Sequence, residues 1–557
     1  MKRNFRIKSI DSTLPEYQKL RQGSLTTFDL TALGIAAIVG GGIFSAIGEV
    51  ASKGGPAVSI LFLFTAIACA FSGLCYAVFA SRIPVSGSAY TYAYASFGEF
   101  IAWVIGWDLI LEYAIGNIAV AISWSDYFTA MLNNTYLQIP AYLSTDFWTA
   151  AHSSQGEAFL AWQTAPELFG IKLIADIPAF AIVFLISVLV FVGIRESKIA
   201  GNIMVLFKLI ILIMVIGVGA FFVNPENWKP FNPAGIGGVL KGVGGVFFAY
   251  IGFDAITTTA EECKNPKRDL PRAMIASLVI STVLYIVIAL VLTGIVHYTE
   301  LAGGDPLAKV FRLINKPHFS YFIAAGAIVA MASVLLVFQV GQPRIWMAMS
   351  RDGLLPARFS KIHKKFKTPS FATVVAGILV AVPALFLNIS EVTDLTSIGT
   401  LFAFILVCTG VMVLENRGEL DKNRYPDAFH LPKINSRWIL PIVWIGIVAF
   451  FIQKGNVSEF LSFHENELFA SQIISKILTV VFILISFLIS VFAIIKNLSA
   501  IPVLGLIINF FLMTELTPAT WVRFLIWLTI GLIIYFTYGR KHSLFNLKLH
   551  DGNKQKN

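Results

Sequence analysis

Long apolar segments recur along the whole chain, and they constrain its fold more than any other feature of the sequence. A helix that crosses a bilayer needs about 20 mostly apolar residues, and runs of this kind alternate here with short polar loops. Composition agrees, because 57% of the 557 residues are hydrophobic and 13% are charged, against about 45–50% and about 25% in soluble domains. We therefore expect an all-α integral membrane protein. The predicted spans are residues 27–50, 56–81, 99–131, 176–193, 200–223, 238–262, 271–297, 320–350, 371–388, 394–415, 438–453, 470–496, 499–514 and 518–538.

The basic residues indicate how the chain is oriented. Lys and Arg number 42 and Asp and Glu 32, which gives a net charge of +10. If the amino terminus lies in the cytoplasm, most of the Lys and Arg fall in inner loops, as the positive-inside rule requires. We therefore predict a multi-pass protein of the cell membrane with both termini cytoplasmic. Nucleic acid is not expected as a partner, because the basic residues are spread over short loops and not gathered on a soluble domain.

The spacing of the spans predicts the domain organisation. One long connection, at roughly 132–175, is expected to form an extracellular cap, and no soluble part is large enough for an active site, so we do not expect an enzyme. The sequence implies no partner subunit; the lipid bilayer is the expected surrounding. The expected parts are a cytoplasmic N-terminal segment at 1–25, a first five-helix repeat at 26–231, a second at 232–418, four peripheral transmembrane helices at 419–540 and a cytoplasmic tail at 541–557.

Three consecutive glycines interrupt the first span. Gly40, Gly41 and Gly42 precede Ile43 at mid-depth, and each glycine costs a helix about 1 kcal/mol relative to alanine, so local unwinding is expected. Unwound backbone is tolerated inside a membrane only where it faces protein or a cavity. Its free N–H groups, together with the start of the following half-helix, would bind a carboxylate. The alternative is a close-packing face of small residues.

A second glycine-rich interruption lies in the sixth span, within residues 242–254. Carbonyl oxygens released near Ala249, Tyr250 and Ile251 could accept an ammonium group, with Phe248 and Tyr250 closing over the ligand. Two interrupted spans in corresponding positions of two halves point to an inverted-repeat transporter with a midplane site. A carboxylate pocket beside an ammonium pocket describes an α-amino acid.

Charged residues within spans are costly and usually functional. Lys208 lies in the middle of the fifth span, and we expect it to gain and lose a proton during transport; the alternative is a fixed charge that pins this span to the first interruption. Asp254 follows the second interruption and either shifts with gating or caps freed amides. The only driving force expected is a proton gradient, and no cofactor or metal is expected, because the histidines lack metal-ligand spacing.

Further acidic positions leave alternatives open. Glu112 lies four residues after Asp108 on the third span and therefore on the same helix face. Glu112 could contact the substrate, bind backbone of the interrupted helices or pair with Lys208. Glu261 and Glu262, at the inner end of the sixth span, are expected to be solvated or salt-bridged.

Several motifs together resemble the amino acid–polyamine–organocation superfamily, and within it the cationic amino acid transporter family and its bacterial amino acid permease relatives. The resemblance implies the leucine-transporter type fold, a 5+5 inverted repeat with broken helices 1 and 6 and about fourteen transmembrane helices. The motifs are Gly40–Phe44, Pro84–Tyr90, Gly106–Tyr113, Phe248–Asp254 with Glu261–Pro266, Ser350–Pro356, and Ile501–Gly505 with Tyr538–His542.

The resemblance also implies roles for residues. The amides of Gly40–Gly42 would contact the substrate carboxylate, Phe248 would be the aromatic gate, and Lys208 would replace the sodium ion of other members. Met331 is expected to border the side-chain pocket in place of a smaller residue, which favours neutral substrates. Glu112 departs from a more neutral residue in animal members.

The expected function is secondary active import of neutral L-amino acids, driven by protons. Cationic amino acid transport and exchange of one amino acid for another are the alternatives within transport. A channel would need a continuous polar lining, and an integral-membrane transferase would need an acid, histidine or metal cluster near one membrane face. The sequence shows neither feature.

Overall fold

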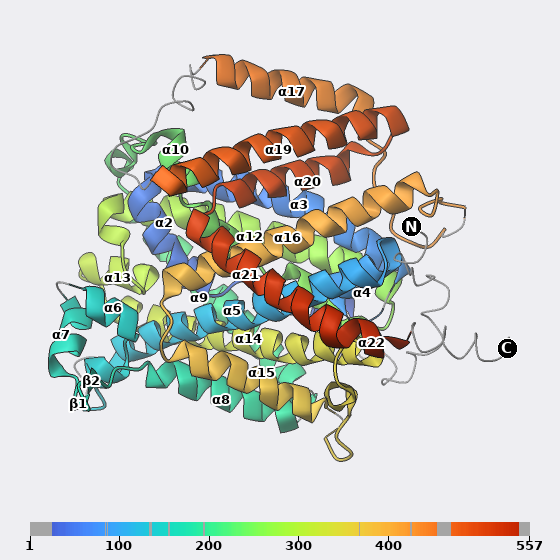
Figure 1. The fold of residues 1–557 in the computed structure, drawn as a ribbon. Helices are drawn as coiled ribbons and strands as arrows, with labels where there is room; N and C mark the ends of the chain where they lie inside the picture. The colour runs from blue at the N-terminus through green and yellow to red at the C-terminus, as the bar shows by residue number, and fades with distance from the viewer. Residues whose placement is uncertain are drawn as a thin grey trace.

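The computed structural model describes residues 25–544, except for 84, 86, 133–135, 154–155, 193–194, 367, 424–425 and 454–468. Its long helices run side by side in roughly one direction (Figure 1). In this described part, nine helices are long and apolar enough to cross a membrane, and four shorter apolar helices accompany them. The all-α prediction is confirmed. The predicted segment at 1–25, apart from Leu25, and most of the predicted tail at 541–557 lie outside the described residues.

Helices in the first part of the chain correspond to the first five predicted spans. A capping box starts the first helix, where the Thr26 side chain accepts from the Asp29 N–H and the Asp29 carboxylate accepts from the Thr26 N–H. Gly55, at φ 65°, turns the chain between the first two spans. The elements are α1 (Thr27–Ile38), η2 (Gly42–Ala46), α2 (Ile47–Gly54), η3 (Gly55–Ala57), α3 (Val58–Arg82), α4 (Ser88–Ser96), α5 (Glu99–Leu132), α8 (Ile177–Val192) and α9 (Arg195–Ala220).

The next five predicted spans follow in the same manner. Helix α14 packs along α5, and α12 packs along α3 and α1, so helices far apart in sequence share one core. The elements are α10 (Gly235–Leu240), α11 (Val243–Phe248), η6 (Phe253–Glu262), α12 (Pro266–Ile295), α14 (Pro317–Arg351), α15 (Ser370–Ala384) and α16 (Ile389–Asn416).

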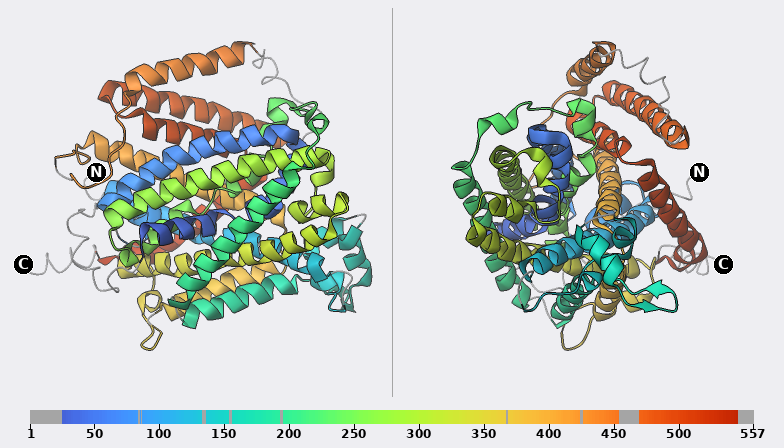
Figure 2. Two further views of the ribbon diagram at one scale, coloured as in Figure 1. Left: turned by 180° about the vertical axis from the view of Figure 1, so that it is seen from behind. Right: turned by 90° about the vertical axis from the view of Figure 1, so that its left-hand side faces the viewer.

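The last four predicted spans lie along the outside of this bundle (Figure 2). Helix α21 is attached to α5 by two indoles: the Trp107 N–H donates to the Trp527 carbonyl (2.8 Å) and the Trp527 N–H to the Trp107 carbonyl (3.1 Å). Their rings stack with centroids 4.6 Å apart. The elements are α17 (Ser436–Gln453), α19 (Phe469–Lys496), α20 (Ala500–Thr514), α21 (Pro518–Ile534), η9 (Tyr535–Gly539) and α22 (Arg540–His542).

Short elements cover the two ends of the bundle. The long connection forms a small cap at one end, where α6, α7 and a hairpin lie together, and α22 lies at the opposite end (Figure 1). The hairpin pairs Glu167 with Lys172 and is the only sheet in the described residues. The capping elements are η4 (Ala141–Leu143), α6 (Phe147–His152), α7 (Gly156–Thr164), β1 (Glu167–Leu168), β2 (Ile171–Lys172), η5 (Pro225–Trp228), η7 (Tyr298–Leu301), α13 (Pro306–Leu313) and η8 (Ala357–Ser360).

Both predicted interruptions are present. Helix α1 stops at Ile38, Val39 is extended, and the chain resumes as the π-helical turn η2 at Gly42. Helix α11 stops at Phe248, Gly252 has φ 110°, and the chain continues as the 3₁₀ helix η6. The prediction of broken first and sixth helices is confirmed.

We expect Gly42→Ala to destabilise the protein, because an added methyl group would meet the Ala249 Cα at 2.3 Å. Overpacking of this kind costs roughly 1–3 kcal/mol, so the midpoint of thermal unfolding in detergent should fall. Gly217→Ala is the matched control, since its methyl group would meet nothing within 4 Å. An equal or higher midpoint for Gly42→Ala would contradict the close approach.

Candidate functional site

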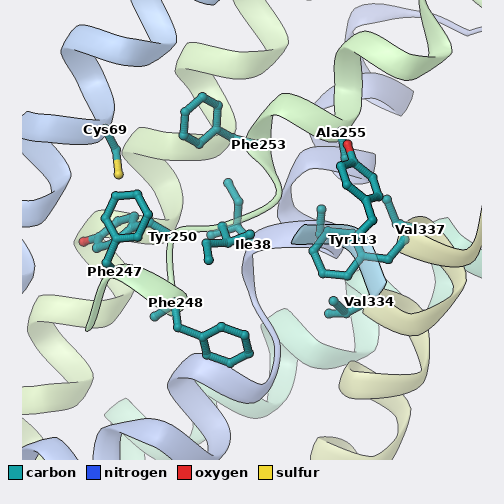
Figure 3. Close-up of a cluster of buried hydrophobic side chains, with 14 of the residues drawn as sticks. Ile38, Cys69, Tyr113, Phe247, Phe248, Tyr250, Phe253, Ala255, Val334 and Val337 are labelled. Atoms are coloured by element: carbon teal, nitrogen blue, oxygen red, sulfur yellow. The ribbon is translucent and has the colours of Figure 1, made fainter. Parts of the chain in front are cut away.

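The two helix interruptions lie directly against each other. Gly42 allows this contact, because any side chain there would overlap the Ala249 backbone. Tyr285 of α12 joins the same segments, since its hydroxyl lies 2.9 Å from both the Ile38 and the Ala249 carbonyl oxygens. The two interruptions therefore border one shared region, with Ile38 and Phe248 near its centre (Figure 3).

Backbone groups at the interruptions remain available to a ligand. Among the described residues, the Gly40 N–H finds no acceptor, and the carbonyl oxygens of Tyr250 and Ile251 find no donor. Gly41 and Gly42 are buried beside Gly40. Amide donors at the start of a half-helix suit a carboxylate, and free carbonyl oxygens suit a cation. The geometry is thus able to hold both charged ends of a zwitterion.

Three side chains border Gly40 and Gly41. A Cβ atom at Gly41 would lie 3.1 Å from the Ser123 Oγ and 3.6 Å from the Phe248 ring, and one at Gly40 would lie 2.4 Å from a Val334 methyl group. The Ser123 hydroxyl is buried and has no hydrogen-bond partner among the described residues. This side of the region is therefore apolar except for one hydroxyl.

The aromatic residues of the second interruption point in different directions. Phe248 projects toward Val334 and Tyr113, whereas Tyr250 lies near Cys69 and Phe247 (Figure 3). The Tyr250 hydroxyl donates to the Phe62 carbonyl at 3.0 Å. Phe248 thus borders Gly41, while Tyr250 contributes its main chain and turns its ring toward α3.

Lys208 is completely buried and lies against the first interruption. Its ammonium group donates to the Val39 carbonyl at 2.7 Å and to the Ala36 carbonyl at 3.1 Å. Ala36 is in the last turn of α1 and Val39 is the residue that caps it, and the end of a helix leaves carbonyl groups without intrahelical partners. Within the described residues no carboxylate forms an ion pair with Lys208, so the two carbonyl groups at the end of α1 are what stabilise its positive charge. A change in that charge would in turn change the hydrogen bonds that hold the end of α1.

Glu112 lies on α5 beside Asp108, close enough to Asp254 of η6 to interact with it electrostatically. Together with Asp108 it faces α16, where a Cβ atom at Gly399 would lie 3.1 Å from an Asp108 oxygen and 3.7 Å from the Glu112 Cβ. Glu112 is 2% exposed, and its Oε2 atom has no hydrogen-bond partner in the described part of the chain. The predicted sharing of one helix face by these two acids is confirmed.

Asp254 occupies the first turn after the second interruption. Its Oδ2 atom accepts from the Ser88 and Tyr113 hydroxyls, each at 3.3 Å. Its Oδ1 atom is buried and finds no donor among the described residues. Asp254 therefore connects η6 to α4 and α5.

Two further predicted residues are buried near the region. Ile43 is 0% exposed in η2, and Met331 is 0% exposed in α14. Met331 precedes Val334 by three residues, which places both on neighbouring positions of one helix face. Because Val334 contacts Gly40, this part of α14 forms a wall of the region.

The end of the bundle opposite the start of α1 is tightly closed. The Tyr127 hydroxyl of α5 donates to the Phe44 carbonyl at 2.5 Å. A Cβ atom at Gly48 would lie 2.6 Å from the Leu301 carbonyl and 2.7 Å from Pro306. The interruptions are therefore shielded from that end by η2, α2, η7 and α13.

Sequence reasoning did not single out Tyr285 or Ser123. Each is a polar side chain inside a long apolar run, which is the signal that could have found them. Many other hydroxyls in the spans simply donate to the preceding helical turn, so this signal alone does not identify a site. No group of three His, Cys, Asp or Glu side chains in the described residues is placed to hold a metal ion.

Comparisons with known proteins agree with this architecture. Residues 25–463 match the family described as "Amino acid permease", and residues 499–543 match "C-terminus of AA_permease". The branched-chain amino acid permease BcaP of Bacillus subtilis is 37% identical over 97% of this chain and 99% of its own length. The methylthioribose transporter of Bacillus subtilis is 36% identical over 94% of this chain and 95% of its own length.

Eukaryotic transporters match over a similar extent. Cationic amino acid transporter 4 of Homo sapiens is 31% identical over 97% of this chain and 90% of its own length. These relatives are named as permeases and transporters, not as enzymes, and their family has the leucine-transporter type fold, which the two broken helices fit. The chain is therefore a multi-pass membrane protein that belongs to the amino acid permease family of the amino acid–polyamine–organocation superfamily.

Proposed function

We propose that this permease imports a neutral L-amino acid together with a proton. One observation carries the proposal: an amide at Gly40 and carbonyl oxygens at Tyr250 and Ile251, all without partners among the described residues, border the same buried region. Such groups complement a carboxylate and an ammonium group held on one carbon atom. The substrate backbone would then be recognised by main chain, and the side chain by Phe248 and Val334.

The neighbourhood of Gly40 and Gly41 favours a neutral side chain over a cationic one. Ser123, Phe248 and Val334 are the side chains nearest to these glycines, and none is acidic. A buried cationic side chain would need an opposite charge or several acceptors. The relative named as a branched-chain amino acid permease supports the same choice, and the cationic amino acid transporters supply the alternative.

Lys208 is the proposed proton site, with Asp254 as a second candidate. A neutral Lys208 would keep two N–H donors for the Ala36 and Val39 carbonyls but would lose the positive charge that strengthens both hydrogen bonds, so loss of its proton would loosen the end of α1. Asp254 links η6 to two neighbouring helices and could respond to the same motion. The proton gradient would be the only driving force, with no cofactor, and both termini would lie in the cytoplasm.

A competition panel in proteoliposomes tests substrate choice. We expect leucine and other neutral amino acids to compete for uptake, and arginine and methylthioribose to compete poorly.

Met331→Ser should admit longer side chains, because it removes volume near Val334. An unchanged competition profile for Met331→Ser would mean that this residue does not border the pocket, and preferred uptake of arginine by the wild type would favour cationic transport.

Lys208→Arg tests proton coupling. Arginine keeps a positive charge near the end of α1 but does not lose its proton in proteins. We expect the variant to lose uptake driven by a pH gradient while retaining exchange of internal for external leucine. Lys541→Arg, on α22, is the matched control. Gradient-driven uptake that survives in Lys208→Arg would mean that Lys208 only pins the helices together, and wild-type uptake that ignores the gradient would favour exchange.

Gly41→Val tests where the carboxylate binds. The valine side chain would occupy the space between Gly41, Ser123 and Phe248, so leucine binding measured by scintillation proximity should be lost. Gly217→Val controls for the substitution itself, because nothing lies within 4 Å of its added Cβ atom. Wild-type affinity in Gly41→Val would place the carboxylate elsewhere.

A further inference from the structure

A cavity lies between the interruptions and the end of the bundle where α1 begins. Its volume is about 70 Å³, and α1, α9, η6 and α14 form its walls. At one extreme it reaches Ala36, whose carbonyl holds Lys208. At the other it reaches Leu25 and Arg344. The cavity therefore extends from the candidate substrate site toward the side that we propose to be cytoplasmic.

Arg344 supplies the only positive charge among the described residues that line this cavity, and the carboxylates of Asp29 and Glu262 line it too. Its side chain is 6% exposed and its Nη2 atom lies 2.6 Å from the Glu262 Oε1 atom. The Nη1 atom is buried and has no hydrogen-bond partner in the described part of the chain. Thr258, Thr259 and Ser333 add hydroxyl groups to the same walls.

The guanidinium group is incompletely compensated in this arrangement. A guanidinium carries five N–H donors in a planar fork and matches a carboxylate best through two parallel hydrogen bonds. Arg344 makes one short contact to a glutamate that is itself 30% exposed. An unsatisfied buried donor is costly, so a second carboxylate that enters the cavity would be attracted to Arg344.

Arg344 and Glu262 lie on opposite walls of the cavity. The Glu262 carbonyl accepts from the Leu25 N–H at 3.1 Å, and the Leu25 carbonyl accepts from the Lys264 N–H at 3.0 Å, so Glu262 is joined to the segment that leads into α1. Arg344 belongs to α14, which packs along α5. The ion pair therefore bridges the two broken helices on one side and α14 on the other, across the route out of the cavity.

We propose that Arg344 is a second carboxylate-binding residue, which takes the carboxylate of an amino acid at the inner end of its path and releases Glu262 in exchange. Glu262 occupies the position of that carboxylate when no substrate is there. When the substrate carboxylate displaces the Glu262 carboxylate from Arg344, the two walls of the cavity separate and the route out of it opens. This inference rests on the proposed function, because it requires an α-amino acid as the cargo.

The test compares the two sides of the membrane. Leucine exchange is measured in right-side-out and inside-out vesicles, which gives a KM for each side. Arg344→Gln should raise the KM of the inner side about tenfold, the usual loss for one charge-assisted hydrogen bond, and leave the outer KM unchanged. Glu262→Gln should lower or preserve the inner KM, since it removes the competitor for Arg344.

A purely structural ion pair predicts a different result, because both variants would then shift the inner KM upward together. That outcome, or an inner KM unaffected by Arg344→Gln, would overturn the inference. If Arg344→Gln fails to fold, Arg344→Lys replaces it: an ammonium group keeps the contact with Glu262 but not the fork, so a wild-type inner KM would again overturn the inference. Absence of exchange of every neutral amino acid in the wild type would instead refute the proposed function.

Discussion

Backbone polar groups inside a bilayer must find partners, and the whole arrangement around the two interruptions depends on this requirement. Water is not available there to replace the hydrogen bonds that a broken helix loses. Lys208 donates to the Ala36 and Val39 carbonyls, and Tyr285 donates to either the Ile38 or the Ala249 carbonyl. The groups left over, at Gly40, Tyr250 and Ile251, are the ones that can receive a ligand.

The same requirement connects binding to movement. The two side chains that donate to the interrupted backbone stand on different helices, Lys208 on α9 and Tyr285 on α12. A change in charge at Lys208 or in occupancy at Gly40 therefore alters contacts between helices and not only within one. Glu262 extends this dependence to α14 through its ion pair with Arg344.

Much of this could be predicted from the sequence, for identifiable reasons. Three contiguous glycines forecast the first interruption because their effect on a helix is local, and Lys208 was identifiable because a charge at mid-depth is rare. The directions in which the side chains of Tyr250 and Glu112 point were not predictable, because they depend on which helix lies beside each. The neighbouring helix is α3 for the Tyr250 hydroxyl and α16 for Glu112. Glu262, expected to be solvated or salt-bridged, forms an ion pair, but its partner Arg344 is 82 residues away. The boundaries of the two repeats stay predictions.

The hydroxyl of Tyr285 has a consequence of its own. The hydroxyl group carries one hydrogen atom, yet two carbonyl oxygens lie at the same 2.9 Å from its oxygen. At any instant one of the two is left with a lone pair unused, and rotation about a single C–O bond decides which. The Tyr285 hydroxyl can thus donate to either half of the fold, and the switch from one carbonyl oxygen to the other moves no atom heavier than hydrogen.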